Sequence, residues 1–131
     1  MIDELMAATG TSWPVIVIAQ DYPKSDLFHG WTKKALPGSW LWKTLAPDDD
    51  DVLESYIRVS RAVDRAEIDP LLRSIADDEG EAGSCILTVP SLAWLYAPYA
   101  GGADVIAPTA HLRDVLRSEH TEWLSVHPSG L

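Results

Sequence analysis

The chain has 131 residues, of which 47% are hydrophobic and 23% charged, and 20 acidic against 10 basic residues give a formal net charge of −10. This size and composition predict a single globular domain over residues 1–131 and argue against intrinsic disorder. The negative charge disfavours binding to nucleic acid or to an anionic membrane surface, since both depend on Lys and Arg. One cysteine excludes an internal disulfide framework and a multi-cysteine zinc site.

The start of the chain and its apolar runs bear on its location. Asp3 and Glu4 make the first residues acidic, whereas a secretory signal peptide begins with positive charge. The longest apolar run, Pro14–Ala19, is far shorter than the roughly 20 residues that cross a bilayer. We therefore expect a cytoplasmic protein with no membrane contact.

The first predicted element is a short helix over residues 2–8. Its apolar residues Ile2, Leu5 and Met6 recur at helical spacing. Gly10 follows where a helix commonly ends, because glycine adopts a left-handed backbone without strain.

Apolar and alternating runs predict the strands. The run Trp13–Ala19 is continuous and rich in β-branched residues, which is typical of a buried strand. Prolines, glycines and lysines make residues 20–38 a predicted loop. The expected strands cover residues 13–19, 39–45, 54–63, 84–89, 92–99 and 104–107.

Capping residues predict two further helices. Asp69 and Pro70 suit the N-cap and first position of one helix, and Gly80 suits its C-terminal end. Thr109 is the N-cap candidate of the last helix. The residues of this helix that we expect to face inward are Leu112, Val115 and Leu116.

The order of these elements indicates the fold class. Strands follow one another along the chain and the helices are few. This segregation predicts an α+β fold: an antiparallel or mixed sheet of about five to six strands, with two or three helices packed mainly on one face.

The segment Leu95–Ala107 resembles a bacterial family of unknown function that carries a hairpin with a tyrosine, a Gly-Gly pair and an Asp-Val-Ile-Ala end. The residues that carry the resemblance are Tyr99, Gly101, Gly102 and Asp104. A Trp-Leu pair follows in the family, as Trp123-Leu124 does here, but Ala100 replaces the family's usual acid. The resemblance implies a relation to toxin-immunity-type proteins and no known enzymatic activity.

The same hairpin also has a purely structural interpretation. Gly101 and Gly102 would supply the positive φ angles of a tight turn. Asp104 would accept hydrogen bonds from backbone N–H groups of the turn. Either Val105 or Ile106 would then fill the core.

Acidic residues form the first set of candidates for partner binding. They lie in two clusters, Asp48, Asp49, Asp50 and Asp51 in a predicted turn, and Asp77, Asp78 and Glu79 at the end of a predicted helix. The first cluster lacks the glycine and ligand spacing of an EF-hand loop, and a solvated acidic turn is its alternative interpretation. The second cluster opposes the helix dipole without an evident structural gain, which favours a functional role.

Tryptophans form the second set of candidates. Alternation places Trp40 and Trp42 on one face of a strand, and Tyr56 and Arg58 on one face of the next. If these faces coincide, they make an aromatic and cationic patch typical of binding hot spots. The alternative is that residues 20–38 cover this face. Two other tryptophans, Trp13 and Trp123, are expected in the core.

Catalytic and metal-binding motifs are not evident. The histidines His29, His111, His120 and His127 do not stand at metal-ligand spacings. Cys85 lies in an apolar strand and is expected to be a small core residue. The sequence therefore predicts no metal and no cofactor.

These observations favour a non-enzymatic, acidic binding protein of immunity or antitoxin type that occludes a basic protein partner such as a nuclease toxin. Two alternatives stay open. One is a small enzyme with a carboxylate–histidine site near residues 99–111, formed by Tyr99, Asp104 and His111. The other is a regulatory or structural homodimer joined through a sheet edge.

Overall fold

The computed structural model describes residues 1–21, 31–47, 54–77 and 84–124. Its helices are α1 (Ile2–Thr9), α2 (Trp31–Ala35), α3 (Arg65–Ala76), α4 (Ala110–Glu119) and the short 3₁₀ helix η1 (Thr121–Trp123). Its strands are β1 (Val15–Asp21), β2 (Trp40–Leu45), β3 (Ser55–Ala62), β4 (Cys85–Thr88), β5 (Leu95–Tyr99) and β6 (Gly102–Ile106).

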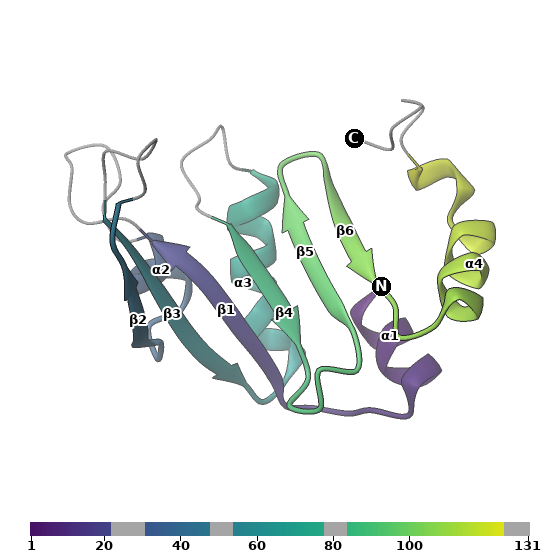
Figure 1. The fold of residues 1–131 in the computed structure, drawn as a ribbon, viewed down its shortest axis with the longest axis horizontal. Helices are drawn as coiled ribbons and strands as arrows, with labels where there is room; N and C mark the ends of the chain where they lie inside the picture. The colour runs from purple at the N-terminus through teal and green to yellow at the C-terminus, as the bar shows by residue number, and fades with distance from the viewer. Residues whose placement is uncertain (22–30, 48–53, 78–83, 125–131) are drawn as a thin grey trace.

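The strands form a six-stranded sheet in the order β2-β3-β1-β4-β5-β6, and each neighbouring pair is antiparallel. In Figure 1, α2 and α3 lie behind the strands and α4 lies beside β6. The predicted α+β fold, with helices on one face of the sheet, is confirmed. None of the described helices is long and apolar enough to cross a membrane.

The hydrophobic core lies between the helices and one face of the sheet. In β1 the buried side chains include Val15, Val17 and Ala19, while Ile16 and Ile18 between them are only half-buried. The buried set packs in one cluster with helical residues that include Ile2, Leu5, Met6, Ile68, Leu71, Ile75 and Leu116. The described helices therefore cover one face of this strand, whose residues are buried there and half-buried on the other face.

Two helices begin and end close to the predicted positions. Helix α1 ends at Gly10, whose φ of 64° is left-handed, as its place after the last turn requires. Helix α4 begins after Thr109, whose hydroxyl accepts a hydrogen bond of 3.1 Å from the Leu112 N–H. Its inner side is formed by the half-buried Leu112 and Val115 and the buried Leu116.

Helix α3 begins earlier than predicted. Its N-cap is Asp64, whose carboxylate accepts from the Glu67 N–H at 3.2 Å, while the Glu67 carboxylate accepts from the Val63 N–H at 2.6 Å. This reciprocal arrangement is close to a capping box and satisfies two backbone donors. The predicted start at Asp69 was wrong, and Pro70 lies inside the helix.

The segment predicted as a loop over residues 20–38 contains regular structure. Strand β1 continues to Asp21, and α2 follows at Trp31–Ala35. The Thr32 hydroxyl, which is fully buried, donates a short hydrogen bond to the buried Asp21 carboxylate. The Trp31 indole donates to the Gln20 carbonyl at 3.2 Å, so polar contacts tie α2 to the end of β1.

The β5–β6 hairpin uses its two glycines differently. Tyr99 pairs with Gly102, which leaves Ala100 and Gly101 as the loop. Only Gly101 has a positive φ, 91°, so the expectation that both glycines supply such angles was wrong. A Cβ on Gly102 would lie 3.0 Å from the Tyr99 ring, so any larger residue there would require the ring to shift.

The buried tryptophan is Trp94, not the pair that the sequence favoured. Trp94 is 1% exposed, and its indole donates to the Thr11 hydroxyl at 3.2 Å. Trp13 is partly buried against the core, whereas Trp123 is 62% exposed, so the core assignment of Trp123 was wrong. In the hairpin, Val105 faces the core.

Candidate functional site

The sheet face opposite the helices carries two rows of mainly apolar side chains. Directly paired residues of antiparallel strands lie on the same face, so the register identifies each row. The first row crosses four strands as Trp40, Val59, Ile18 and Ile86. The second crosses β1, β4, β5 and β6 as Ile16, Thr88, Leu95 and Ile106. We call these eight residues the outer face, and the exposed Arg61 of β3, which pairs with Ile16, lies on the same side.

The outer face is partly open to solvent. Trp40 is 51% exposed, Ile86 37% and Ile106 63%, and all but Thr88 of the remaining residues are half-buried. An antiparallel sheet with one solvated face ordinarily carries polar residues there. Contiguous apolar surface on a folded domain is typical of an interaction site. The outer face is thus the strongest candidate site among the described residues.

The hairpin that carries the family resemblance borders this surface. Asp104 pairs with Ala97 and Tyr99 with Gly102, which puts both side chains on the same side as Ile106. Tyr99 is 50% exposed and Asp104 is exposed. The predicted motif residues therefore extend the outer face and give it one carboxylate.

The predicted patch of Trp40, Trp42, Tyr56 and Arg58 does not form as expected. Tyr56 pairs with Asp21 and Arg58 with Ala19, so both lie on the helix side, whereas Trp40 lies on the outer face. The irregularity between Leu41 and Lys43 contains Trp42 and breaks the simple alternation on which the prediction relied. Trp42 itself is exposed.

The polar members of that predicted patch have local partners. The Tyr56 hydroxyl donates to the Glu54 carboxylate at 3.0 Å, and this hydrogen bond raises the pKa of Tyr56 above its ordinary value. Arg58 donates to the hydroxyl and the carbonyl of Ser39, at 3.0 and 2.9 Å. These contacts tie the start of β2 to β3.

The acidic candidates are placed only in part. Asp48, Asp49, Asp50, Asp51, Asp78 and Glu79 lie outside the described residues. Asp77 is exposed and follows the last turn of α3, where its N–H donates to the Arg73 carbonyl at 2.8 Å. A partner-binding role for either cluster stays a prediction.

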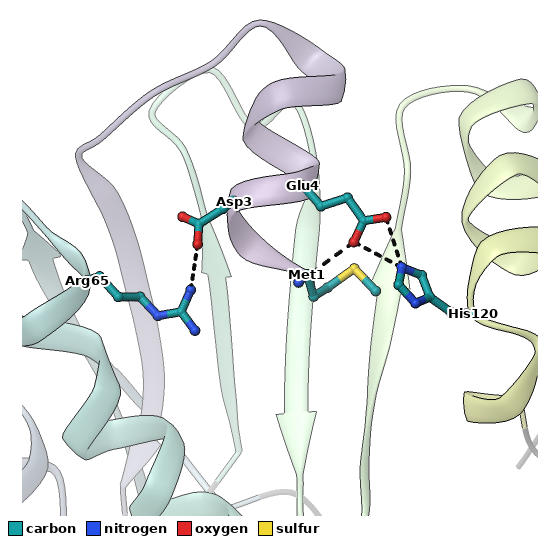
Figure 2. A network of polar contacts seen from close by, with 5 residues as sticks. All are labelled: Met1, Asp3, Glu4, Arg65 and His120. Carbon is teal, nitrogen blue, oxygen red and sulfur yellow. Dashed lines mark hydrogen bonds and ion pairs between the residues drawn. The ribbon is translucent and has the colours of Figure 1, made fainter.

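Figure 2 shows a cluster of polar and charged groups where α1 meets the end of α4. We call it the polar centre, and its members are Met1, Asp3, Glu4, Arg65 and His120. Asp3 and Glu4 project from different sides of α1. Asp3 pairs with Arg65 at 2.8 Å, and Arg65 also holds Asp69 at 2.7 Å, which raises the Arg65 pKa. Glu4 contacts His120 at 2.8 Å. Sequence spacing gave no signal for this contact, since its partners lie 116 positions apart.

The groups considered for catalysis are not assembled in the described part of the chain. Tyr99 and Asp104 lie on the outer side of the hairpin, while His111 lies in the first turn of α4, and no hydrogen bond joins the three there. Cys85 pairs with Ala19 on the helix side and is buried. Burial raises the pKa of its thiol to about 12, which is unsuited to a nucleophile.

The fold and this surface define the class: an α+β domain with a single antiparallel sheet that carries two mainly apolar rows on the side away from the described helices. A model of the family Domain of unknown function (DUF3885) matches residues 3–128, and the chain belongs to this family. This confirms the expected membership of a family of unknown function, while the hairpin pattern and the immunity relation stay predictions. No curated protein and no solved structure matches the chain.

Proposed function

We propose that this protein is a non-enzymatic binding protein of immunity or antitoxin type, and that its outer face binds a basic protein partner such as a nuclease toxin. The observation that carries the proposal is the pair of apolar rows with Trp40, Ile86 and Ile106 exposed. We place this function in the cytoplasm, whose reducing conditions suit a chain with one free cysteine.

The charge of the chain supports a basic partner. Its 20 acidic and 10 basic residues leave ten uncompensated negative charges. Complementary charge speeds the encounter of two proteins, while apolar contacts at the centre of the interface slow dissociation. Asp104 adds a carboxylate at the border of the outer face.

Trp40 and Tyr99 are the proposed anchors. Both are about half exposed, at 51% and 50%; Trp40 is on the edge strand β2 and Tyr99 is on β5, next to the opposite edge. Tryptophan and tyrosine are enriched among the residues that dominate binding free energy. The aliphatic residues between them would exclude water from the interface.

The test begins with capture of partners from a lysate of the source organism at low and moderate salt. A captured basic protein is then purified and its affinity measured against Trp40→Ala, Ile86→Glu and a control, Leu92→Glu. Leu92 is 65% exposed but lies outside both rows, in the connection between β4 and β5. We expect the two outer-face variants to bind at least about tenfold more weakly, a loss of about 1.4 kcal/mol.

Two outcomes would overturn the proposal. One is a basic partner whose affinity is the same for wild type, Trp40→Ala and Ile86→Glu. The other is a concentration-dependent dimer that Ile86→Glu dissociates, which would assign the outer face to a second copy of the chain. Sedimentation equilibrium of the purified wild type and Ile86→Glu distinguishes this case.

A further inference from the structure

Three potential metal ligands meet at the junction of α1 and α4. Glu4, Glu119 and His120 each offer one ligand atom, and these atoms all lie within 4.8 Å of one another. His120 Nε2 lies 2.8 and 2.9 Å from the two carboxylate oxygens of Glu4. The carboxylate and the imidazole therefore already face each other across the gap between two helices.

The spacing is close to that of ligands on one ion. With metal–ligand bonds of roughly 2.0–2.2 Å in a tetrahedral site, neighbouring nitrogen and oxygen ligands stand roughly 3.3–3.6 Å apart. The Nε2 atom and the nearer Glu4 oxygen, now 2.8 Å apart, would separate by roughly half an ångström or more to admit an ion. Glu119 is the last residue of α4 and directly precedes His120. A change of its side-chain rotamer would bring its carboxylate within bonding distance of the same ion.

The imidazole is held in place by its surroundings. The rings of His120 and Trp123 stack with centroids 4.1 Å apart and planes at 12°. The backbone N–H of His120 donates to the Leu116 carbonyl at 3.0 Å, and this hydrogen bond holds the backbone of His120 at the end of α4. The side chain of His120 is 19% exposed and that of Glu4 31%. A ligand that is already oriented loses little freedom when an ion binds.

We propose that Glu4, Glu119 and His120 form a binding site for a divalent transition metal ion of the zinc type. One imidazole and two carboxylates are donors that Zn²⁺ accepts, and three protein ligands leave a fourth position for water or for a ligand from a partner. The two carboxylates balance the charge of the ion. This site is separate from the outer face and does not depend on the function proposed above.

One neighbouring positive charge competes with a cation for Glu4, and a second is paired with another carboxylate. The amino group of Met1, drawn in Figure 2, lies 3.8 Å from a Glu4 oxygen, and a bound ion would displace it from this contact. Arg65 pairs with Asp3, which projects from a different side of α1, and so does not occupy Glu4. A bound ion would connect α1 to α4 and add to the stability of the folded chain.

The first experiment titrates zinc chloride into the full chain after treatment with a chelator and measures binding by calorimetry. The variants are Glu4→Gln, Glu119→Gln and His120→Gln, and the matched control is Glu122→Gln. Glu122 is exposed and lies three positions beyond Glu119, but it is not part of the triad. We expect one zinc ion per wild-type and control chain, and at least about tenfold weaker binding in each triad variant.

A second readout uses the stacked tryptophan. Cobalt or copper at the triad quenches the fluorescence of Trp123, so wild type should lose an emission component that Trp123→Phe lacks. Glu119→Gln keeps the test decisive if the other variants fail to fold, because the Glu119 side chain is exposed and outside the core. The proposal is overturned if wild type binds no zinc, or if zinc binds equally well to Glu119→Gln and His120→Gln, as it would to scattered surface histidines.

Discussion

Trp40 pairs with Val59 across β2 and β3, and this places the indole on the sheet face that the helices leave uncovered. Val59 pairs in turn with Ile18, and Ile18 with Ile86, so one apolar row spans four strands. The alternation of β1 exposes one set of its aliphatic residues to the outer face while the other set fills the core. The apolar surface is thus a direct consequence of register.

The first prediction concerns this surface in the isolated protein. A dye that fluoresces in apolar environments should bind the native wild type, and Trp40→Ser or Ile106→Ser should reduce its signal. The stability of Ile106→Ser should change by no more than about 0.5 kcal/mol, because the Ile106 side chain is mostly exposed. Dye titration and urea unfolding measure the two effects. Equal dye binding by all variants would place the apolar surface elsewhere.

The second prediction concerns the hairpin glycines. Gly102→Ala should destabilise the fold, because the new Cβ would lie 3.0 Å from Cε2 and the hydroxyl oxygen of Tyr99. Gly101→Ala should cost about 1–2 kcal/mol, because its φ of 91° is unfavourable for any side chain. When Tyr99 is also replaced by alanine, the loss of stability caused by Gly102→Ala should shrink. The loss caused by Gly101→Ala should stay the same. Urea unfolding of the single and double variants measures this coupling.

The third prediction is a dependence of stability on alkaline pH. Burial raises the pKa of the Cys85 thiol from 9.0 to about 12. Above pH 9 the unfolded chain loses this proton while the folded chain retains it, so the free energy of unfolding falls as pH rises from 9 toward 12. Below pH 9 both states hold the proton and the effect vanishes.

The test compares wild type with Cys85→Ala by urea unfolding between pH 8 and pH 10.5. The variant should show a shallower fall, with a remaining slope from Tyr96, whose pKa is raised by burial. The thiol should also react slowly with a disulfide reagent at pH 8 until the chain unfolds. Equal slopes in both proteins would contradict the assignment to Cys85.

Local signals predicted much of the fold. Gly10 and Thr109 were recognised correctly because each acts within a few residues of a helix end. The apolar run in β1 predicted a buried strand, but only the packed structure shows which of its two faces the helices cover. The side of Trp40 depended on its register against Val59, and that of Trp42 on a strand irregularity, and no periodicity in the sequence reveals either.

The contact between Glu4 and His120 could not be predicted from the sequence, for a different physical reason. Glu4 and His120 lie 116 positions apart, and their contact exists only because α1 and the end of α4 pack together. A histidine and a glutamate on different elements have no spacing rule. His120 was noted only as one of four histidines that do not stand at metal-ligand spacings.

The final prediction distinguishes the two candidate starts of α3. Asp64→Ala removes the side chain that accepts from the Glu67 N–H, so the free energy of unfolding should fall by about 1 kcal/mol. Asp69→Ala removes an exposed ion pair with Arg65, which is worth only about 0.2–1 kcal/mol. Salt should therefore reduce the effect of Asp69→Ala and leave most of the effect of Asp64→Ala, because a capping hydrogen bond is screened less than an exposed pair of charges. Urea unfolding at low and high salt provides the comparison. A larger and salt-independent loss at Asp69 would mean that the helix begins there in solution, with the preceding turn unfolded.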